Sequence, residues 1–197
     1  MTPLTLPPGH FSAYLFDLDG TIADSMPLHY IAWSKAIAEH GGHFPEELFY
    51  AMGGLPLIKV VEELNRKFAC NMDPAAVVAR KESLYLSMLD RLQPIPAVVA
   101  LIRHSAGTVP FAIVSGSPRA SILKTLTALN LLHYFPVIVG SEDYLHGKPN
   151  PEPFLNAARL LNVAPSACLV FEDAQPGIEA AKAAGMQYVL VPTASPE

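Results

Sequence analysis

Polar residues that could carry out chemistry occur at four places in this chain, each beside a short apolar segment or in the loop that follows one. They are Asp17-Leu18-Asp19-Gly20-Thr21, Ser115-Gly116-Ser117, Gly147-Lys148-Pro149 and Glu172-Asp173. Any one of them alone is typical of turns and helix caps. The four acids, brought together, would repel one another unless a cation lay among them. The combination therefore predicts a cation site.

The ligand types indicate which cation this is. Oxygen ligands with no histidine or cysteine beside them favour Mg²⁺ over Zn²⁺. Mg²⁺ keeps several waters and accepts phosphate oxygens of a substrate as ligands. The Ser115 hydroxyl can donate to a phosphate oxygen, Gly116 lets the backbone come close, and the helix expected after Pro118 offers its N-terminus. Lys148 adds a positive charge between a glycine and a proline.

Two of the acids have a spacing that suits phosphoryl transfer. An aspartate beside Mg²⁺ can attack phosphorus and form an aspartyl-phosphate. A second acid two residues later can protonate the leaving oxygen and then activate water. Asp17 and Asp19 have this spacing, and Gly20 supplies the turn that lets both acids face one site.

A parallel sheet would bring these residues together. Apolar segments without polar alternation predict five buried strands, over 13–16, 111–114, 137–139, 168–171 and 188–191. Helical patterns alternate with them, over 96–106, 118–129, 152–162 and 176–184. This rhythm is typical of a doubly wound α/β fold. Ligands bind outside the carboxyl ends of such strands, where the four polar places would meet.

One interval breaks this rhythm. Between Asp17 and the helix expected at Pro96 there is no strand candidate, and three apolar stripes have helical spacing instead. Each stripe begins near a proline, a residue suited to the first turn of a helix. We therefore expect residues 1–24 and 93–197 to form an α/β core domain and residues 25–92 to form an all-helical insertion.

Composition excludes some partners. Lys and Arg total 13 and Asp and Glu total 18, a net charge of −5 that gives no reason to expect nucleic acid. No basic segment precedes an apolar run at the N-terminus, so no signal peptide is expected. No apolar run of about 18 residues could cross a membrane. Cys70 and Cys168 are expected as buried, unpaired thiols, which suits a cytoplasmic protein.

The four motifs, in this order, resemble those of the haloacid dehalogenase (HAD) superfamily. Asp17-Leu-Asp-Gly-Thr21 resembles its first motif, and Ser115, Lys148 and Glu172-Asp173 resemble the second, third and fourth. The resemblance covers residues 12–192. Two stretches, 147–154 and 171–180, look most like the β-phosphoglucomutase-like group, and especially its small bacterial fructose-1-phosphate phosphatases.

The resemblance implies a role for each motif residue. Asp17 would be the nucleophile and a Mg²⁺ ligand. Asp19 would be the general acid and base, and its main-chain carbonyl a further ligand. Asp173 would bind the metal, with Glu172 either a ligand or an acid beside the ligands. The phosphoryl group would be held by Ser115, Gly116 and Lys148.

The insertion would be a cap that closes over the site and selects the substrate, which would make a monomer sufficient. Lys81 lies in the middle of an apolar helical arc, where a lysine must reach solvent or meet an anion. It matches a cap lysine that contacts substrate in the phosphoglucomutase group. His29 matches a histidine near the site, and a structural histidine is the alternative.

The expected reaction depends on one departure from the mutases. They hold a second phosphate with a cap arginine, and the matching residue here is Leu57, with no Arg or Lys between Gly41 and Ile58. A Mg²⁺-dependent phosphatase of small sugar monophosphates is therefore favoured over a β-phosphoglucomutase, which is kept as the alternative. A phosphate-binding protein without activity is a third reading, disfavoured by the intact pair Asp17 and Asp19.

Overall fold

The computed structural model describes residues 4–192, so the ends of the predicted core domain, 1–3 and 193–197, lie outside the described residues. Five strands form one parallel sheet in the order β5-β4-β1-β6-β7. They are β1 (Ala13–Phe16), β4 (Phe111–Val114), β5 (Val137–Val139), β6 (Cys168–Glu172) and β7 (Gln187–Leu190). The predicted fold class is confirmed, with shifts of one residue in β6 and β7.

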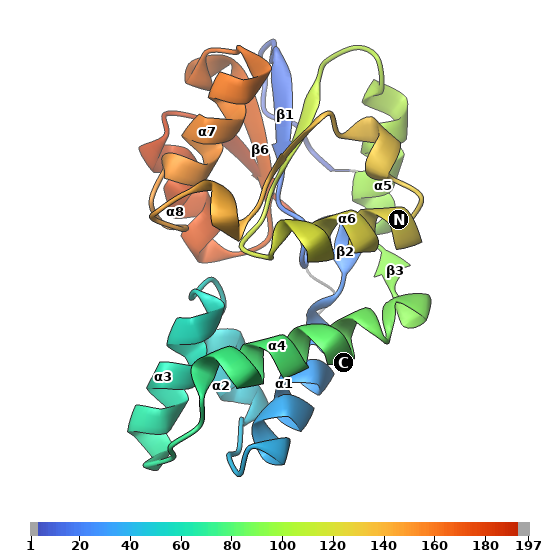
Figure 1. Ribbon diagram of the computed structural model, residues 1–197. Coiled ribbons are helices and arrows are strands. Elements are labelled where there is room, and N and C mark those ends of the chain that lie inside the picture. The colour runs from blue at the N-terminus through green and yellow to red at the C-terminus, as the bar shows by residue number, and fades with distance from the viewer. Residues whose placement is uncertain (1–3, 193–197) are drawn as a thin grey trace.

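Helices cover both faces of this sheet (Figure 1). One face packs against α5 (Pro96–Ser105) and α6 (Arg119–Ala128), and the other against α7 (Glu152–Leu161) and α8 (Gln175–Ala183). Phe16 and Phe171 stack at 4.5 Å between neighbouring strands on the α5–α6 face. Single 3-10 turns are η1 (Leu89–Arg91), η2 (Leu132–Tyr134), η3 (Ser141–Asp143) and η4 (Pro165–Ala167). Burial of both faces explains why the strands show no polar alternation.

The insertion lies at the carboxyl ends of the strands (Figure 1). It contains four helices: α1 (Met26–Glu39), α2 (Glu46–Ala51), α3 (Leu57–Phe68) and α4 (Pro74–Leu86). Its apolar side chains form a cluster of their own, which includes Trp33, Val61 and Val77. Helix α2 was not predicted, because six residues with one buried side chain, Phe49, present no periodicity.

Two short strands correct the expectation that no strand occurs between Asp17 and Pro96. β2 (Ala23–Asp24) pairs antiparallel with β3 (Gln93–Pro94), so Asp24 lies opposite Gln93. Two residues are too few for any apolar pattern to predict a strand. The predicted boundaries at 24–25 and 92–93 lie beside this pair, and the division into two domains stays a prediction.

The insertion touches the core on two sides of the strand ends. On one side, the Tyr85 hydroxyl of α4 lies 2.8 Å from Thr125 Oγ1 of α6. On the other, a Cβ placed on Gly54 would lie 3.2 Å from Pro176 Cγ at the start of α8. These two contacts hold the insertion against the carboxyl ends of the strands, where the polar motifs lie.

Two smaller expectations can also be compared with the structure. Cys70 and Cys168 are free thiols, but only Cys168 is buried, because Cys70 follows the exposed end of α3. Among residues 4–192, no helix has the length and apolar character needed to cross a membrane.

Candidate active site

The turn after β1 places the first motif beside the fourth. Gly20 has a φ of +90°, and a Cβ there would lie 2.3 Å from Asp173 Oδ2. The Thr21 hydroxyl donates to Asp173 Oδ1 at 2.9 Å. The main-chain N–H of Asp17 donates to the Phe171 carbonyl at 3.0 Å, which ties β1 to β6. Gly20 is therefore required both for its backbone conformation and for the approach of Asp173.

Replacing Gly20 with alanine is expected to reduce activity at least about a hundredfold, because Asp173 must move from its place. Gly41→Ala is the matched control, since Gly41 also has a positive φ, of +81°, but a Cβ there meets nothing within 4 Å. Both variants should lose about 1–3 kcal/mol of unfolding free energy from backbone strain. Steady-state assays and urea unfolding of both variants check this, and equal activities would contradict it.

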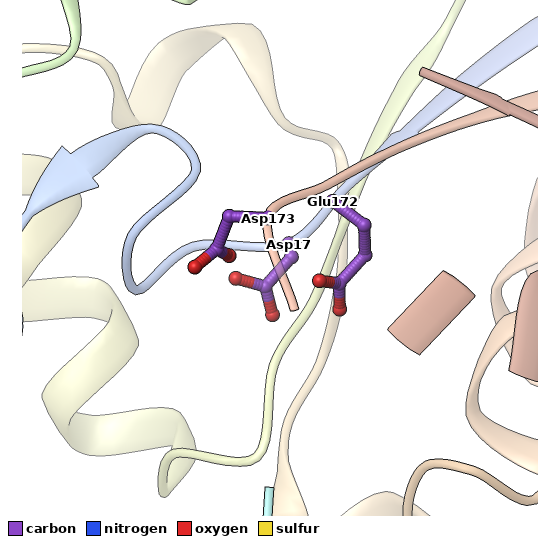
Figure 2. Close-up of side chains that lie close together, drawn as sticks. All are labelled: Asp17, Glu172 and Asp173. Atoms are coloured by element: carbon purple, nitrogen blue, oxygen red, sulfur yellow. The ribbon is translucent and has the colours of Figure 1, made fainter. Parts of the chain in front are cut away.

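Three carboxylates gather at the carboxyl edge of the sheet (Figure 2). Asp17, Glu172 and Asp173 each offer an oxygen, and these oxygens all lie within 4.8 Å of one another. We call these residues the acidic cluster. Burial raises the pKa of Asp17 well above its ordinary value, and burial and Glu172 raise the pKa of Asp173 to about 6. Burial and the neighbouring acids thus disfavour the charged forms of these carboxyls, and a divalent cation among them would favour those forms, so the cluster fits such a cation.

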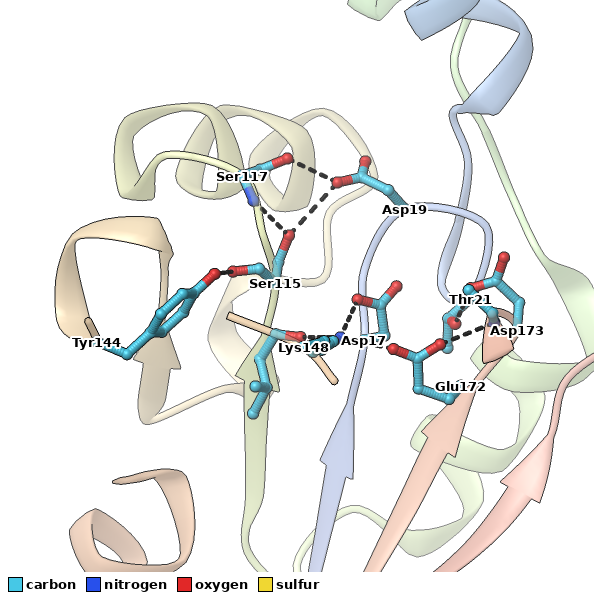
Figure 3. A network of polar contacts seen from close by, with 11 residues as sticks. Asp17, Asp19, Thr21, Ser115, Ser117, Tyr144, Lys148, Glu172 and Asp173 are labelled. Carbon is cyan, nitrogen blue, oxygen red and sulfur yellow. Dashed lines mark hydrogen bonds and ion pairs between the residues drawn. The ribbon is translucent and has the colours of Figure 1, made fainter. Parts of the chain in front are cut away.

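Lys148 supplies positive charge to the acidic cluster (Figure 3). Its Nζ lies 2.6 Å from Asp17 Oδ1 and 2.6 Å from Glu172 Oε1, and it donates to the Val114 carbonyl at 3.0 Å. Burial lowers the pKa of Lys148, but attraction to Asp17 and Glu172 outweighs burial and raises it above its ordinary value. One lysine faces three acids, so it can balance the charge of only one of them.

Glu172 is the most confined acid of the cluster. Its side chain is buried, and Oε2 accepts a hydrogen bond from the Ala174 N–H at 2.9 Å. A Cβ on Gly177 would lie 1.8 Å from Glu172 Oε1, so that glycine leaves the room that the side chain needs. Both oxygens of Glu172 are thus engaged by the protein, one by Lys148 and one by a main-chain N–H.

Asp19 faces away from the acidic cluster (Figure 3). Its carboxylate accepts hydrogen bonds from four side chains, Ser25 Oγ at 2.7 Å, His29 Nε2 at 2.9 Å, Ser117 Oγ at 2.7 Å and Ser115 Oγ at 3.4 Å. Burial alone would raise the pKa of Asp19, but His29 and the hydroxyls lower it below its usual range. The surroundings of Asp19 therefore lower its pKa, whereas those of Asp17 raise its pKa.

The hydroxyl and the carbonyl of Ser115 in the second motif both have partners within the chain. The Ser117 N–H donates to Ser115 Oγ at 3.0 Å, and the Tyr144 hydroxyl donates to the Ser115 carbonyl at 3.2 Å. A Cβ on Gly116 would meet nothing within 4 Å, so this residue borders open space.

One N–H group at the start of α6, where a phosphate is expected, already has a partner within the chain. The first N–H of α6, at Arg119, donates to the Glu142 carboxylate at 3.0 Å, so it is not offered to a phosphate. Glu142 lies 23 residues further along the chain, in η3, and no sequence pattern connects it to α6. An acid near a helix N-terminus satisfies its free N–H groups and its dipole.

The insertion contributes residues around Asp19. His29 is buried, and its ring stacks on Tyr85 with centroids 4.0 Å apart. Burial and the charge of Lys81 lower the pKa of His29, so the neutral ring donates through Nε2 to Asp19. Lys81 does not reach solvent, because it is 2% exposed, and its Nζ meets Glu82 Oε1 at 2.7 Å.

Several residues of the site were not predicted. Ser25 precedes α1 in the position of a helix cap, yet its hydroxyl makes no capping bond and donates to Asp19. In sequence it cannot be told from an ordinary cap. Glu82 and Tyr85 each contact the core through a hydroxyl of α6, and such contacts between distant segments have no sequence signal.

This arrangement suits two chemical roles, that of a nucleophile at Asp17 and that of an acid–base group at Asp19. Asp17 lies beside a lysine and two further acids, and Asp19 lies two residues away among neutral donors. The chain can therefore bind a cation and an anion at Asp17 and move a proton at Asp19.

Comparisons with known proteins agree with this geometry. The family model described as haloacid dehalogenase-like hydrolase matches residues 14–191. The chain is 35% identical over 180 residues to the fructose-1-phosphate phosphatase of Escherichia coli (strain K12), covering 91% of this chain and 95% of that one. It is 34% identical over 181 residues to hexitol phosphatase A of the same organism, covering 90% and 82%. The crystal structure of β-phosphoglucomutase from Clostridium difficile has a TM-score of 0.82 at 26% identity, covering 90% and 83%.

Proposed function

The chain belongs to the haloacid dehalogenase-like hydrolase family, and from this premise we propose that it is a Mg²⁺-dependent phosphatase of small sugar monophosphates such as fructose 1-phosphate. The observation that carries the proposal is the placement of Asp17 and Asp19 at one edge of the sheet. Asp17 is bonded to Lys148 within the acidic cluster, and Asp19 is not part of that cluster. The names of the two phosphatase relatives support the substrate class.

The proposed reaction has two steps. Asp17 attacks phosphorus, and the bond from phosphorus to the sugar oxygen breaks as Asp19 gives that oxygen a proton. Asp19 then takes a proton from water, the water oxygen attacks phosphorus, and the bond to Asp17 breaks to release inorganic phosphate. Lys148 and Ser115 hold the phosphoryl group during both steps.

The surroundings of Asp19 favour the second of these steps. A carboxylate that accepts four hydrogen bonds is held without its proton, which is the form that a base needs. To act as an acid in the first step, Asp19 must give up some of these donors. The hydroxyls of Ser25 and Ser117 can rotate, so this change needs no movement of the backbone.

In this proposal Mg²⁺ is held by Asp17, Asp173 and the main-chain carbonyl of Asp19. Glu172 positions Lys148 beside these ligands, because both of its oxygens are already engaged. When bound, Mg²⁺ would supply positive charge that reduces the repulsion between the phosphate and Asp17.

Mg²⁺ binding is expected to weaken as the pH falls through about 6. The pKa of Asp173 is raised to about 6, so below this pH the carboxyl holds a proton that a metal must displace. The dissociation constant should rise about tenfold for each pH unit below 6. Calorimetric titration of the protein with Mg²⁺ alone checks this. No sugar phosphate is present, so the ionisation of its phosphate group does not affect the measured constant. A constant that is flat from pH 8 to pH 5 would contradict the ligand role of Asp173.

A mutase is the less favoured alternative, because the insertion has an apolar residue where a mutase would need a charged one. Leu57 begins α3 and packs against the apolar cluster of the insertion, so this position offers no charge to a second phosphate. An arginine there would contribute about 1.5–3 kcal/mol of charge-assisted hydrogen bonding.

A panel of sugar phosphates tests the proposal. We expect Mg²⁺-dependent release of inorganic phosphate from fructose 1-phosphate and from hexitol phosphates. β-Glucose 1-phosphate, supplied with a bisphosphate primer, should give glucose and phosphate. Accumulation of glucose 6-phosphate would favour the mutase, and no turnover of any member would reject both.

A further inference from the structure

We infer that Glu82 determines substrate selectivity, by neutralising Lys81 so that the site favours sugars with one phosphate over those with two. This inference rests on the proposed phosphatase function. Glu82 lies outside the four motifs and was not among the site residues predicted from the sequence.

The position of the leaving group follows from the two acids. Phosphorus lies at Asp17 and the leaving oxygen at Asp19, so the sugar extends from Asp19 toward the insertion. His29 contacts Asp19 there, and Tyr85 stacks on His29. Lys81 and Glu82 lie on the same helix as Tyr85, one turn earlier. The sugar is therefore expected beside this part of α4, where the side chain of Glu82 is partly exposed.

Lys81 is the one buried lysine or arginine in the insertion, all of which the structure describes. Its Nζ lies 5.6 Å from the ring centroids of both Trp33 and Tyr85. The exposed cations Lys59 and Arg66 are paired with glutamates on α3. Lys81 is thus the cation best placed to attract a second phosphate.

Glu82 removes that attraction. Its Oε1 lies 2.7 Å from Lys81 Nζ, and its Oε2 accepts a hydrogen bond from the Ser121 hydroxyl of α6. One turn further along both helices, the Tyr85 hydroxyl is bonded to Thr125. The carboxylate is therefore fixed between α4 and α6 and cannot turn away from Lys81.

A fixed pair of opposite charges treats two kinds of sugar differently. A neutral sugar needs no counter-charge, and its hydroxyls can donate to the Glu82 carboxylate, whose side chain is 15% exposed, whereas that of Lys81 is only 2% exposed. A second phosphate finds no net positive charge and is repelled by the partly exposed Glu82 carboxylate. The pair thus admits a hydroxyl-rich leaving group and opposes an anionic one.

The test compares kcat/KM for fructose 1-phosphate with that for fructose 1,6-bisphosphate. The unmutated chain should prefer the monophosphate at least about tenfold. Glu82→Gln should raise the relative kcat/KM of the bisphosphate at least about tenfold, because the charge of Lys81 is no longer balanced. Glu82→Gln combined with Lys81→Met should return the ratio toward that of the unmutated chain.

Glu63→Gln is the matched control, since it makes the same chemical change in an exposed ion pair with Arg66 and should leave the ratio unchanged. An unmutated chain that uses both sugars equally would overturn the inference, even if Glu82→Gln fails to fold. The inference would also be overturned if Glu82→Gln changed the ratio of kcat/KM for the two sugars by less than about twofold relative to the unmutated chain. If the unmutated chain hydrolyses neither sugar nor any other phosphate of the panel, the proposed function itself fails.

Discussion

Asp17→Asn is expected to lower kcat at least about 10⁴-fold, the loss typical when a nucleophile is removed. The amide nitrogen and oxygen of asparagine are poor nucleophiles toward phosphorus, and no other described carboxylate has the same contact with Lys148 except Glu172, whose oxygens are engaged. Phosphate release over the sugar-phosphate panel measures the loss.

The same variant is expected to remain folded. Burial raises the pKa of Asp17, so ionisation of this side chain costs free energy in the native state, and a neutral amide of the same shape avoids that cost. Lys148 also keeps Glu172 as its charged partner in this variant, so no buried charge is left unpaired. Unfolding by urea without metal should therefore show no loss of stability. Asp90→Asn, an exposed position in η1, is the control for the chemical change. Activity above about 1% of the unmutated chain would show that Asp17 is not the nucleophile.

Lys148→Met is expected to lower the free energy of unfolding of the metal-free chain by about 3–5 kcal/mol, the usual cost of removing one partner of a buried ion pair. Its ammonium lies 2.6 Å from two carboxylates, and its side chain is 11% exposed. Without it, Asp17 and Glu172 face each other with no counter-charge. Activity should be lost as well, because the phosphoryl group loses its positive contact.

Urea unfolding in the presence of a chelator measures the stability loss. Lys182→Met is the control, because Lys182 is exposed and its Nζ lies over the Tyr188 ring at 5.3 Å without a carboxylate partner among residues 4–192. The destabilisation should shrink as the pH is lowered, since protonation of the Asp17 carboxyl, whose pKa burial raises well above its ordinary value, removes the repulsion. A loss below about 1 kcal/mol at pH 8 would contradict the assigned role of Lys148.

Much of the fold could be predicted because the sheet is buried on both faces. Segments such as 111–114, in which every residue is buried, have no polar alternation and are recognisable as parallel strands. Once the strands are placed, the four polar motifs fall at one edge. The two-residue strands β2 and β3 could not be found, because their pairing depends on contacts between distant parts of the chain.

The grouping of side chains within the site was harder to foresee. Asp17 and Asp19 are two residues apart, yet one joins the acidic cluster and the other faces Ser25 and His29. The main-chain N–H of Arg119 donates to the Glu142 carboxylate, and the Ser121 hydroxyl donates to the Glu82 carboxylate. In both pairs the partners lie far apart in the sequence. Residue types indicate what chemistry is available, but such partners depend on the tertiary structure.

The pairing of β2 with β3 also affects which segments can be inserted into such a chain without changing its sheet. Asp24 lies opposite Gln93, so the insertion departs from the core and rejoins it at one point. The entropy of closing a loop there rises only slowly with loop length, by about 0.6 kcal/mol for each doubling. Segments of very different size can be accommodated at this point while the strand order of the sheet stays the same. A graft of another helical segment between residues 24 and 93 would therefore exchange the surface that faces the carboxyl ends of the strands and leave Asp17 and Asp19 in place.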